Sequence, residues 1–140
     1  YGHQLAITEW CAEQLLPVLA DTHFDRIIPL PLHADRLRER GFNQSGEIAK
    51  KLAALFTTPV DLASLCRTRA TTPQADLPHK ERQRNVRGAF ECRSDLSGQH
   101  ILLIDDVLTT AATANECARV LKLHGAATVT VAVLARALKD

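Results

Sequence analysis

Apolar and polar positions in the first half of the chain recur at the spacing of amphipathic helices. Residues 5–20 predict a first helix, and its expected inner face consists of Ile7, Cys11, Leu15 and Val18. A short strand is predicted at 24–28, and a second helix from Ser45 with Ile48, Leu52 and Leu55 on one face. Residues 67–93 are polar and show no clear period.

The last third of the chain has the clearest pattern, a strand followed by a helix and a second strand. The continuous apolar run Ile101–Ile104 is typical of a strand buried on both faces of a parallel sheet. A helix is predicted at 113–124, with Gly125 placed to end it, and 128–135 predicts another strand. The whole chain is therefore expected to be α/β, with a mostly parallel sheet flanked by helices.

Composition limits the classes of protein that this chain can belong to. Its 140 residues suit one domain, and 46% hydrophobic residues exclude intrinsic disorder as the main state. The net charge of +1 argues against a uniformly basic nucleic-acid binder, and no apolar run approaches the ~18 residues of a membrane span. Four cysteines without a CxxC pair favour free thiols in a reducing cytoplasm. Because the chain begins at Tyr1 and contains no Met, we expect an upstream segment to be missing.

The strongest candidate site lies between the apolar strand and the helix that follows it. Asp105 and Asp106 are expected at the carboxyl end of the strand, where two adjacent carboxylates need donor groups or a cation such as Mg²⁺. The segment 109–113 supplies three threonines and two alanines before a helix N-terminus, a setting typical of anion binding. Together they indicate a ribose 5-phosphate site. The alternative is a solvated Asp pair with a capping threonine at Thr110 or Thr113.

Charge is distributed unevenly along the chain, although the net charge of the whole chain is only +1. Residues 62–93 have a net charge of +4 and the remainder −3. Such a segment could hold pyrophosphate or nucleic-acid phosphates, or could simply be a solvated loop. Arg67 and Arg84 are the candidates here for pyrophosphate. Arg36 and Arg40 carry the same ambiguity, and Arg40 could instead anchor the turn that follows it.

Three segments resemble a known family. Residues 101–113, with the sequence ILLIDDVLTTAAT, resemble the phosphoribosyl pyrophosphate (PRPP) signature of type I phosphoribosyltransferases. Two more segments, 29–44 with its RGFNQ run and 67–90, narrow the resemblance to the ComF/GntX group, the competence protein F family. The resemblance covers nearly the whole chain, and the RGFNQ run is its most specific part.

The resemblance implies a role for each candidate residue. Asp105 and Asp106 would contact the ribose hydroxyls and orient the sugar for catalysis. The 5-phosphate would be bound by Thr109, Thr110, Ala111, Ala112 and Thr113. Mg²⁺ would be bound mainly through PRPP rather than by the protein. The family signature usually has Gly where this chain has Ala111, a replacement that requires a negative φ at that position.

Several hypotheses about function follow from this resemblance. The first is a cytoplasmic enzyme that transfers ribose 5-phosphate from PRPP to an unidentified acceptor with Mg²⁺, linked by family to DNA uptake or utilisation. The others are a non-catalytic sensor of PRPP or nucleotides, and a DNA-uptake component with a nucleic-acid-binding basic loop. A homodimer is a further possibility, and no membrane partner is expected.

Overall fold

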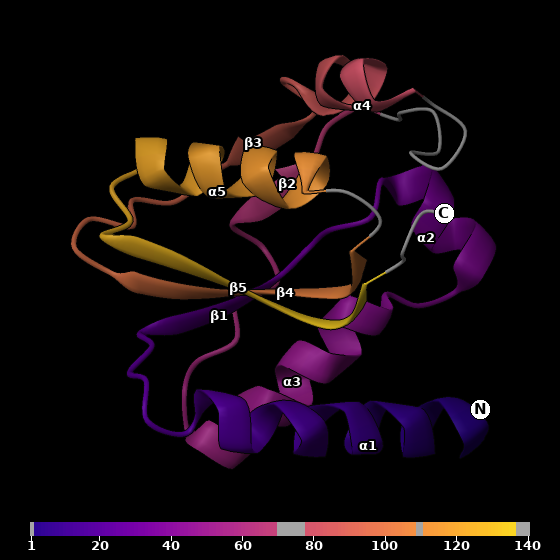
Figure 1. Cartoon of the computed structure of the whole chain (residues 1–140), viewed down its shortest axis with the longest axis vertical. Helices are drawn as coiled ribbons and strands as arrows, with labels where there is room; N and C mark the ends of the chain where they lie inside the picture. Colours follow the sequence, from indigo (N-terminus) through magenta and orange to yellow (C-terminus); the bar gives the residue numbers. More distant parts are fainter. Residues whose placement is uncertain (1, 70–77, 109–110, 137–140) are drawn as a thin grey trace.

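The fold is centred on a parallel sheet, as the computed structural model of residues 2–69, 78–108 and 111–136 shows (Figure 1). The described strands of this sheet follow the order β1-β4-β5, with β1 at Arg26–Pro29, β4 at His100–Leu108 and β5 at Thr128–Arg136. Both strand pairs are parallel. The chain crosses from β4 to β5 through the helix α5, Ala112–Leu123.

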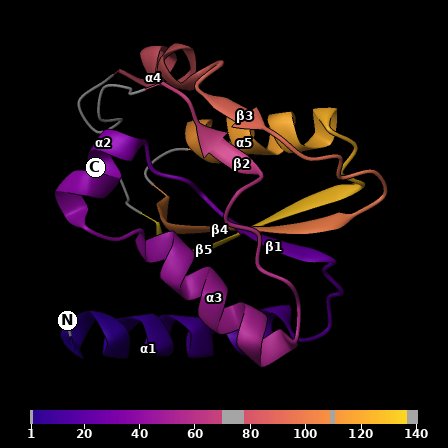
Figure 2. The same ribbon diagram turned by 180° about the vertical axis from the view of Figure 1, so that it is seen from behind.

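Helices cover both faces of the sheet, so the predicted α/β architecture is confirmed (Figures 1 and 2). One face is covered by α1 (Gly2–Leu19) and α3 (Gln44–Phe56), and the other by α5. The short helix α2, Ala34–Arg40, follows β1. None of the helices in the described part of the chain is long and apolar enough to cross a membrane.

The core has two halves, and β4 contributes to both. Ile101 and Leu103 belong to the half beneath α5, whereas Leu102 and Ile104 belong to the half that faces α1 and α3. All four side chains are fully buried. This alternation follows from the two-residue repeat of a strand, and it confirms the prediction that the apolar run is buried on both faces.

The predicted inner faces of the first two helices were partly wrong. Cys11 and Leu15 are buried in α1, but Ile7 and Val18 are exposed, and the core receives Ala12 and Leu19 instead. At 100° per residue, Ile7 and Val18 lie about a quarter turn from the centre of the buried stripe. In α3, Leu55 is likewise exposed although Ile48 and Leu52 are fully buried. A helix with two overlapping apolar stripes does not reveal from sequence which one its neighbours cover.

Strand β4 is longer than its sequence predicts, which places both acidic residues within the strand rather than after it. Asp105 pairs with Val133 of β5, and the ladder continues to Leu108 opposite Arg136. The apolar run ends at Ile104, but β4 continues to pair with the neighbouring strand β5 at Asp105, Val107 and Leu108. The loop before α5 is therefore shorter than expected.

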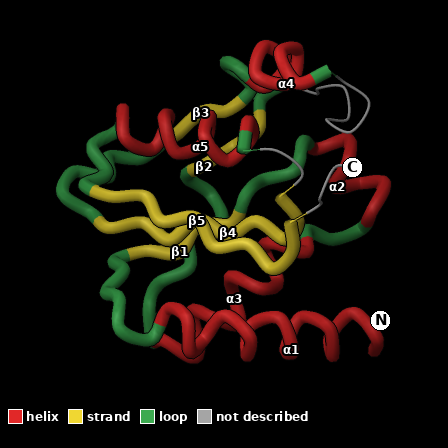
Figure 3. Tube along the Cα trace, viewed as in Figure 1, coloured by secondary structure: helices red, strands yellow, loops and turns green. Residues whose placement is uncertain are grey.

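A small subdomain, here called the cap, stands on α5. It consists of β2 (Leu65–Arg67), α4 (His79–Val86) and β3 (Phe90–Cys92), with β2 and β3 paired antiparallel (Figure 3). Sequence patterns did not assign α4 or β3. The reason is visible in their size and composition, since each strand has three residues and α4, HKERQRNV, is almost entirely polar.

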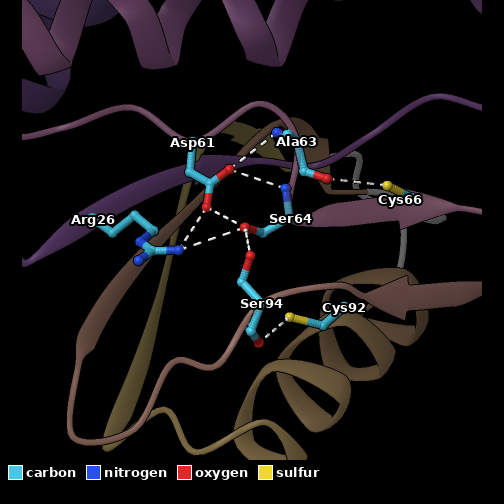
Figure 4. Close-up of polar contacts among 7 residues, drawn as sticks. All are labelled: Arg26, Asp61, Ala63, Ser64, Cys66, Cys92 and Ser94. Carbon is cyan, nitrogen blue, oxygen red and sulfur yellow. Dashed lines mark hydrogen bonds and ion pairs between the residues drawn. The ribbon is translucent and has the colours of Figure 1, made fainter.

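A polar network attaches the cap to the sheet (Figure 4). The carboxylate of Asp61, just before β2, accepts hydrogen bonds from Arg26 of β1 at 2.7 Å and from the Ser64 hydroxyl. It also accepts from the backbone N–H groups of Ala63 and Ser64, and the Ser64 hydroxyl lies 2.6 Å from that of Ser94 beyond β3. Burial alone raises the pKa of Asp61, but these donated hydrogen bonds outweigh it and hold the pKa below its usual value.

Candidate functional site

The carboxyl edge of the sheet is where the candidate residues gather. Strand β1 leads through residues 30–33 into α2, and β4 leads toward the N-terminus of α5, on the same side of the molecule (Figure 1). In open parallel sheets this edge is the usual place for a ligand, because loops from neighbouring strands meet there. The cap lies over the same face as α5 (Figure 2).

Asp105 is a buried acidic residue at this edge. It is only 6% exposed and has interactions within the fold. The alternation along β4 puts it on the side of Ile101 and Leu103, beneath α5. Asp105 also acts electrostatically on Cys117 of α5. Burial raises the pKa of the Cys117 thiol, the charge of Arg67 lowers it, and the negative charges of Asp105 and Glu116 raise it further. The backbone of Asp106 lies in β4 as well.

Arg67 of the cap provides the opposite charge. Its guanidinium lies 5.1 Å from the centre of the Phe90 ring, a cation–π contact across the β2–β3 pair. Burial lowers the pKa of Arg67, the Cys117 thiol opposes this, and the charges of Arg36 and Arg69 lower it further. Arg36 of α2 is therefore within electrostatic range of Arg67, although 31 positions separate them in the sequence.

The other two predicted pyrophosphate residues are placed differently. Arg84 is exposed on α4, where it lines a depression of about 260 Å³ together with Lys80, Gln83 and Arg87. Arg40 is exposed in the last turn of α2. The structure thus brings Arg36 and Arg67 together and groups Arg84 with another set of cations.

The N-terminus of α5 carries the predicted phosphate-binding segment. Ala111 is its N-cap residue, and Ala112 and Thr113 are in the first turn, where backbone N–H groups point out of the helix toward the strand ends. Ala111 has φ −76°, so the alanine is accommodated without the positive φ that would demand glycine. Thr109 and Thr110 lie outside the described residues.

The RGFNQ run, residues 40–44, holds the loop after β1 in place. Gly41 ends α2 with φ 79°, a left-handed conformation that favours glycine. Asn43 donates a hydrogen bond from Nδ2 to the carbonyl of Leu30 at 3.1 Å, and Gln44 donates one to the Thr8 hydroxyl at 3.4 Å. The motif therefore joins α1, α3 and residues 30–33, a role that sequence inspection did not assign to Asn43 or Gln44.

Glu116 is a second residue that sequence inspection missed. It is buried in α5, pairs with Arg119 through two contacts of 2.6 and 2.9 Å, and accepts a hydrogen bond from the backbone N–H of Gly88 at 3.2 Å. The Arg119 hydrogen bonds lower the pKa of Glu116 despite its burial. Glu116 thus joins the cap to α5, the helix whose N-terminus carries the predicted phosphate-binding segment. An acidic residue among apolar ones in a helix was the only available signal.

The described residues contain no cluster of three or more His, Cys, Asp or Glu that could hold a metal ion. All four cysteines are free, and Cys11, Cys92 and Cys117 are buried. The donor chemistry that the edge offers to a cation is the carboxylate of Asp105. A single carboxylate suits a magnesium ion that keeps its other ligands on a phosphorylated substrate and water.

Comparison with known proteins supports the family resemblance seen in the sequence. The sequence profile of the phosphoribosyl transferase domain matches residues 38–140. The DNA utilization protein YhgH of Escherichia coli O157:H7 is 41% identical over 114 residues, which are 81% of this chain and 50% of that protein. Competence protein F of Haemophilus influenzae is 32% identical over 116 residues, 81% of this chain and 51% of that protein. The chain spans about half the length of these curated relatives.

Solved structures share the fold. Adenine phosphoribosyltransferase from Thermoanaerobacter pseudethanolicus aligns with a TM-score of 0.60 at 19% identity, covering 91% of this chain and 67% of that one. UMP synthase from Leishmania donovani aligns with a TM-score of 0.57 at 21% identity, covering 94% of this chain and 22% of that one. The resemblance to the ComF/GntX group and the expected fold class are both confirmed.

Proposed function

Because the chain belongs to the phosphoribosyl transferase domain family, we propose that it binds PRPP and transfers its ribose 5-phosphate group to an acceptor. The supporting observation is that groups of opposite charge lie at the same edge of the sheet. Asp105 is buried on β4, while Arg67 and Arg36 approach from the cap and α2. PRPP needs both kinds of group, carboxylates for its ribose hydroxyls and cations for its pyrophosphate.

Each residue would act by binding and orienting the substrate. Asp105, with Asp106, would accept hydrogen bonds from the 2′- and 3′-hydroxyls of the ribose. The backbone N–H groups from Thr109 to Thr113 would bind the 5-phosphate at the helix N-terminus, where the helix dipole favours an anion. Arg36 and Arg67 would hold the pyrophosphate as a double cation, with bidentate geometry available to each guanidinium.

The reaction would be a displacement at C1 of the ribose. The bond from C1 to the pyrophosphate oxygen breaks, and its electron pair leaves with pyrophosphate. A bond forms from C1 to a nucleophilic atom of the acceptor, whose proton passes to solvent. Positive charge develops on the ribose as the first bond lengthens, so the buried carboxylate of Asp105 stabilises that stage more than the ground state.

The residues present fit a magnesium ion held jointly with the substrate. PRPP would provide most of the ligands of the ion, and the carboxylate of Asp105 would face it, directly or through water, as carboxylates commonly do beside substrate phosphates. When bound, Mg²⁺ would neutralise charge on the pyrophosphate and so make it a better leaving group.

The relatives carry the names DNA utilization protein and competence protein, which is the ground for proposing a role in DNA uptake or utilisation, in the cytoplasm. The acceptor would then be a base or nucleotide derived from imported DNA. The sensor hypothesis uses the same pocket without transfer.

Calorimetric titration of PRPP into the protein, with and without Mg²⁺, tests the binding site. We expect Asp105→Asn with Asp106→Asn to weaken binding by about 10- to 100-fold, the effect of losing charge-assisted hydrogen bonds. The matched control is Asp21→Asn with Asp95→Asn, two exposed carboxylates away from the edge. Unchanged binding in the first variant would show that the pocket is elsewhere.

Release of pyrophosphate from PRPP in the presence of a panel of bases then tests transfer. We expect release that depends on one of the bases and on Asp105. Binding of PRPP without release for any base would replace the enzyme with the sensor.

A further inference from the structure

Asn43 precedes α3 but does not cap it. Asparagine is a favoured N-cap residue because its side chain can accept a hydrogen bond from a backbone N–H in the first turn. The Asn43 side chain makes no such bond. It donates instead from Nδ2 to the carbonyl of Leu30, 13 positions earlier, at 3.1 Å. The side chain therefore holds the loop after β1 rather than the helix that follows it.

This hydrogen bond closes a segment, residues 30–43, that contains all of α2. Leu30 is attached on both sides, because its backbone N–H donates to the Ile104 carbonyl of β4 at 2.8 Å and its own carbonyl accepts from Asn43. Ile104 directly precedes Asp105 in the sequence. The start and the end of the segment therefore meet at a point that is fixed to the strand carrying the buried carboxylate.

Helix α2 needs such an attachment because packing does not hold it in place. None of its seven residues is buried, and a helix of this length is not stable on its own. The ion pair of Asp35 with Arg38 and the hydrogen bond from the Asp35 N–H to the His33 ring both lie within the segment. The position of α2 relative to the sheet is therefore set at its two ends, where the chain enters from β1 and leaves toward α3 (Figure 2).

We infer that Asn43 is a positioning residue for the pyrophosphate half of the proposed site, because its hydrogen bond to Leu30 holds α2 where Arg36 can meet pyrophosphate beside Arg67. The two guanidinium groups are within electrostatic range and repel each other, so an unattached α2 would place Arg36 farther from Arg67. The inference rests on the proposed function. It adds to that function a residue of the RGFNQ run that acts through Arg36 and has no contact of its own with the substrate.

Asn43→Asp tests the inference, because it removes the donor but keeps a side chain that is equally suited to the N-terminus of α3. A carboxylate cannot donate to the Leu30 carbonyl. We expect a melting temperature close to that of the parent and a PRPP affinity lower by about three- to ten-fold in calorimetry, the effect of one lost hydrogen bond.

Ribose 5-phosphate separates positioning from general damage, because it lacks the pyrophosphate. Its affinity should change by less than about two-fold in Asn43→Asp, since the carboxylate of Asp105 and the N-terminus of α5 do not depend on this hydrogen bond. Equal losses of affinity for PRPP and for ribose 5-phosphate would overturn the inference.

A double-mutant cycle tests whether Asn43 acts through Arg36. In an Arg36→Gln background, Asn43→Asp should lower the PRPP affinity by less than about two-fold further, because the group that it positions is already gone. Two independent residues would instead give the product of the two separate losses, and that result would overturn the inference.

The matched control is Gln44→Glu, the same change from amide to carboxylate one position further along. Gln44 donates to the Thr8 hydroxyl of α1 at 3.4 Å, and a carboxylate can accept from that hydroxyl instead. Its PRPP affinity should match that of the parent, and an equal loss in Gln44→Glu and Asn43→Asp would overturn the inference. No PRPP binding by the parent would overturn the proposed function and the inference with it. Binding that Asn43→Asp leaves unchanged would overturn the inference alone.

Discussion

Asp105 stands on a strand whose four preceding residues are fully buried, whereas Arg67 stands on a three-residue strand at the edge of the cap. The β4–α5–β5 unit is held mainly by apolar burial on both faces of β4. The cap has a smaller apolar contribution, chiefly Leu65, Val86, Ala89, Phe90 and Cys92. It depends in addition on two polar anchors, the Arg26–Asp61 ion pair and the hydrogen bond from the Gly88 N–H to Glu116.

The two halves of the proposed site should therefore differ in how easily they open and in how strongly pH and salt affect them. The carboxylate half belongs to the unit that should open only on global unfolding, because its backbone is central in the sheet. The arginine half belongs to a unit that polar contacts attach to the sheet, and such contacts are sensitive to pH and salt. One side of the proposed site is therefore fixed within the sheet, and the other side is attached more weakly.

The largest effect is expected from the apolar core. Leu103→Ala removes a fully buried side chain of β4 and should lower the free energy of unfolding by about 3 kcal/mol, within the usual 2–5 for such truncations. Urea denaturation measures it, with Leu123→Ala, which alters an exposed residue of α5, as the control at under about 0.5 kcal/mol. Similar losses in both would contradict the assignment of the core to β4.

The next effect concerns the arginines of the cap. Arg67→Gln should weaken PRPP binding by about 10- to 100-fold, because a half-buried guanidinium beside the Arg36 charge would lose its contact with pyrophosphate. Arg84→Gln, which alters an exposed residue of α4, should change the affinity by less than about three-fold. Calorimetry of both variants distinguishes the two positions. Equal losses would show that Arg84 binds pyrophosphate together with Arg67, as the sequence predicts.

Sequence patterns anticipated the β4–α5–β5 unit because its signals are local and strong. The run Ile101–Ile104 is apolar without interruption, and Gly125 adopts φ 101° after α5, as its position predicts. A Cβ at Gly125 would lie 2.8 Å from the Cα of Ser97, which adds a second reason for glycine there. The end of β4 was misplaced because pairing with β5, and not apolar composition, decides where that strand stops.

Sequence patterns could not anticipate the cap for an equally physical reason. Its strands are three residues long, and among the residues of α4 whose burial is described only Arg82 and Val86 are buried. The anchors that hold it join positions far apart in the chain, as with Arg26 and Asp61. For the same reason, the sequence does not reveal that Arg36 and Arg67 lie within electrostatic range of each other, and the fold does.

A smaller effect should appear on acidification. The folded state holds the pKa of Asp61 below its ordinary 3.8, so the stability that this carboxylate provides is present above that value and is lost as pH falls through the lower one. Asp61→Asn should cost about 1–2 kcal/mol at neutral pH, because Arg26 loses its charged partner.

Hydrogen-exchange protection of the amides of the cap, measured at neutral pH and near pH 3, resolves where that cost falls. The parent should lose protection in β2 and β3 on acidification while β4 keeps its protection, and Asp61→Asn should show weakened protection of β2 and β3 already at neutral pH. Asp21→Asn, an exposed carboxylate, is the control and should behave as the parent. Equal loss in β4 and the cap would mean that the two regions unfold together.

The smallest effect is expected at Ala111, where this chain departs from the family signature. Because Ala111 already has φ −76°, Ala111→Gly relieves no backbone strain, and the residue is exposed, so no packing is lost. We expect less than about a two-fold change in PRPP affinity by calorimetry, and a loss of stability under about 1 kcal/mol from the added freedom of glycine. A tenfold gain in affinity would show instead that the phosphate requires a backbone conformation that only glycine adopts. Phosphate binding at the N-terminus of α5 would then depend on a change of backbone conformation when the substrate binds.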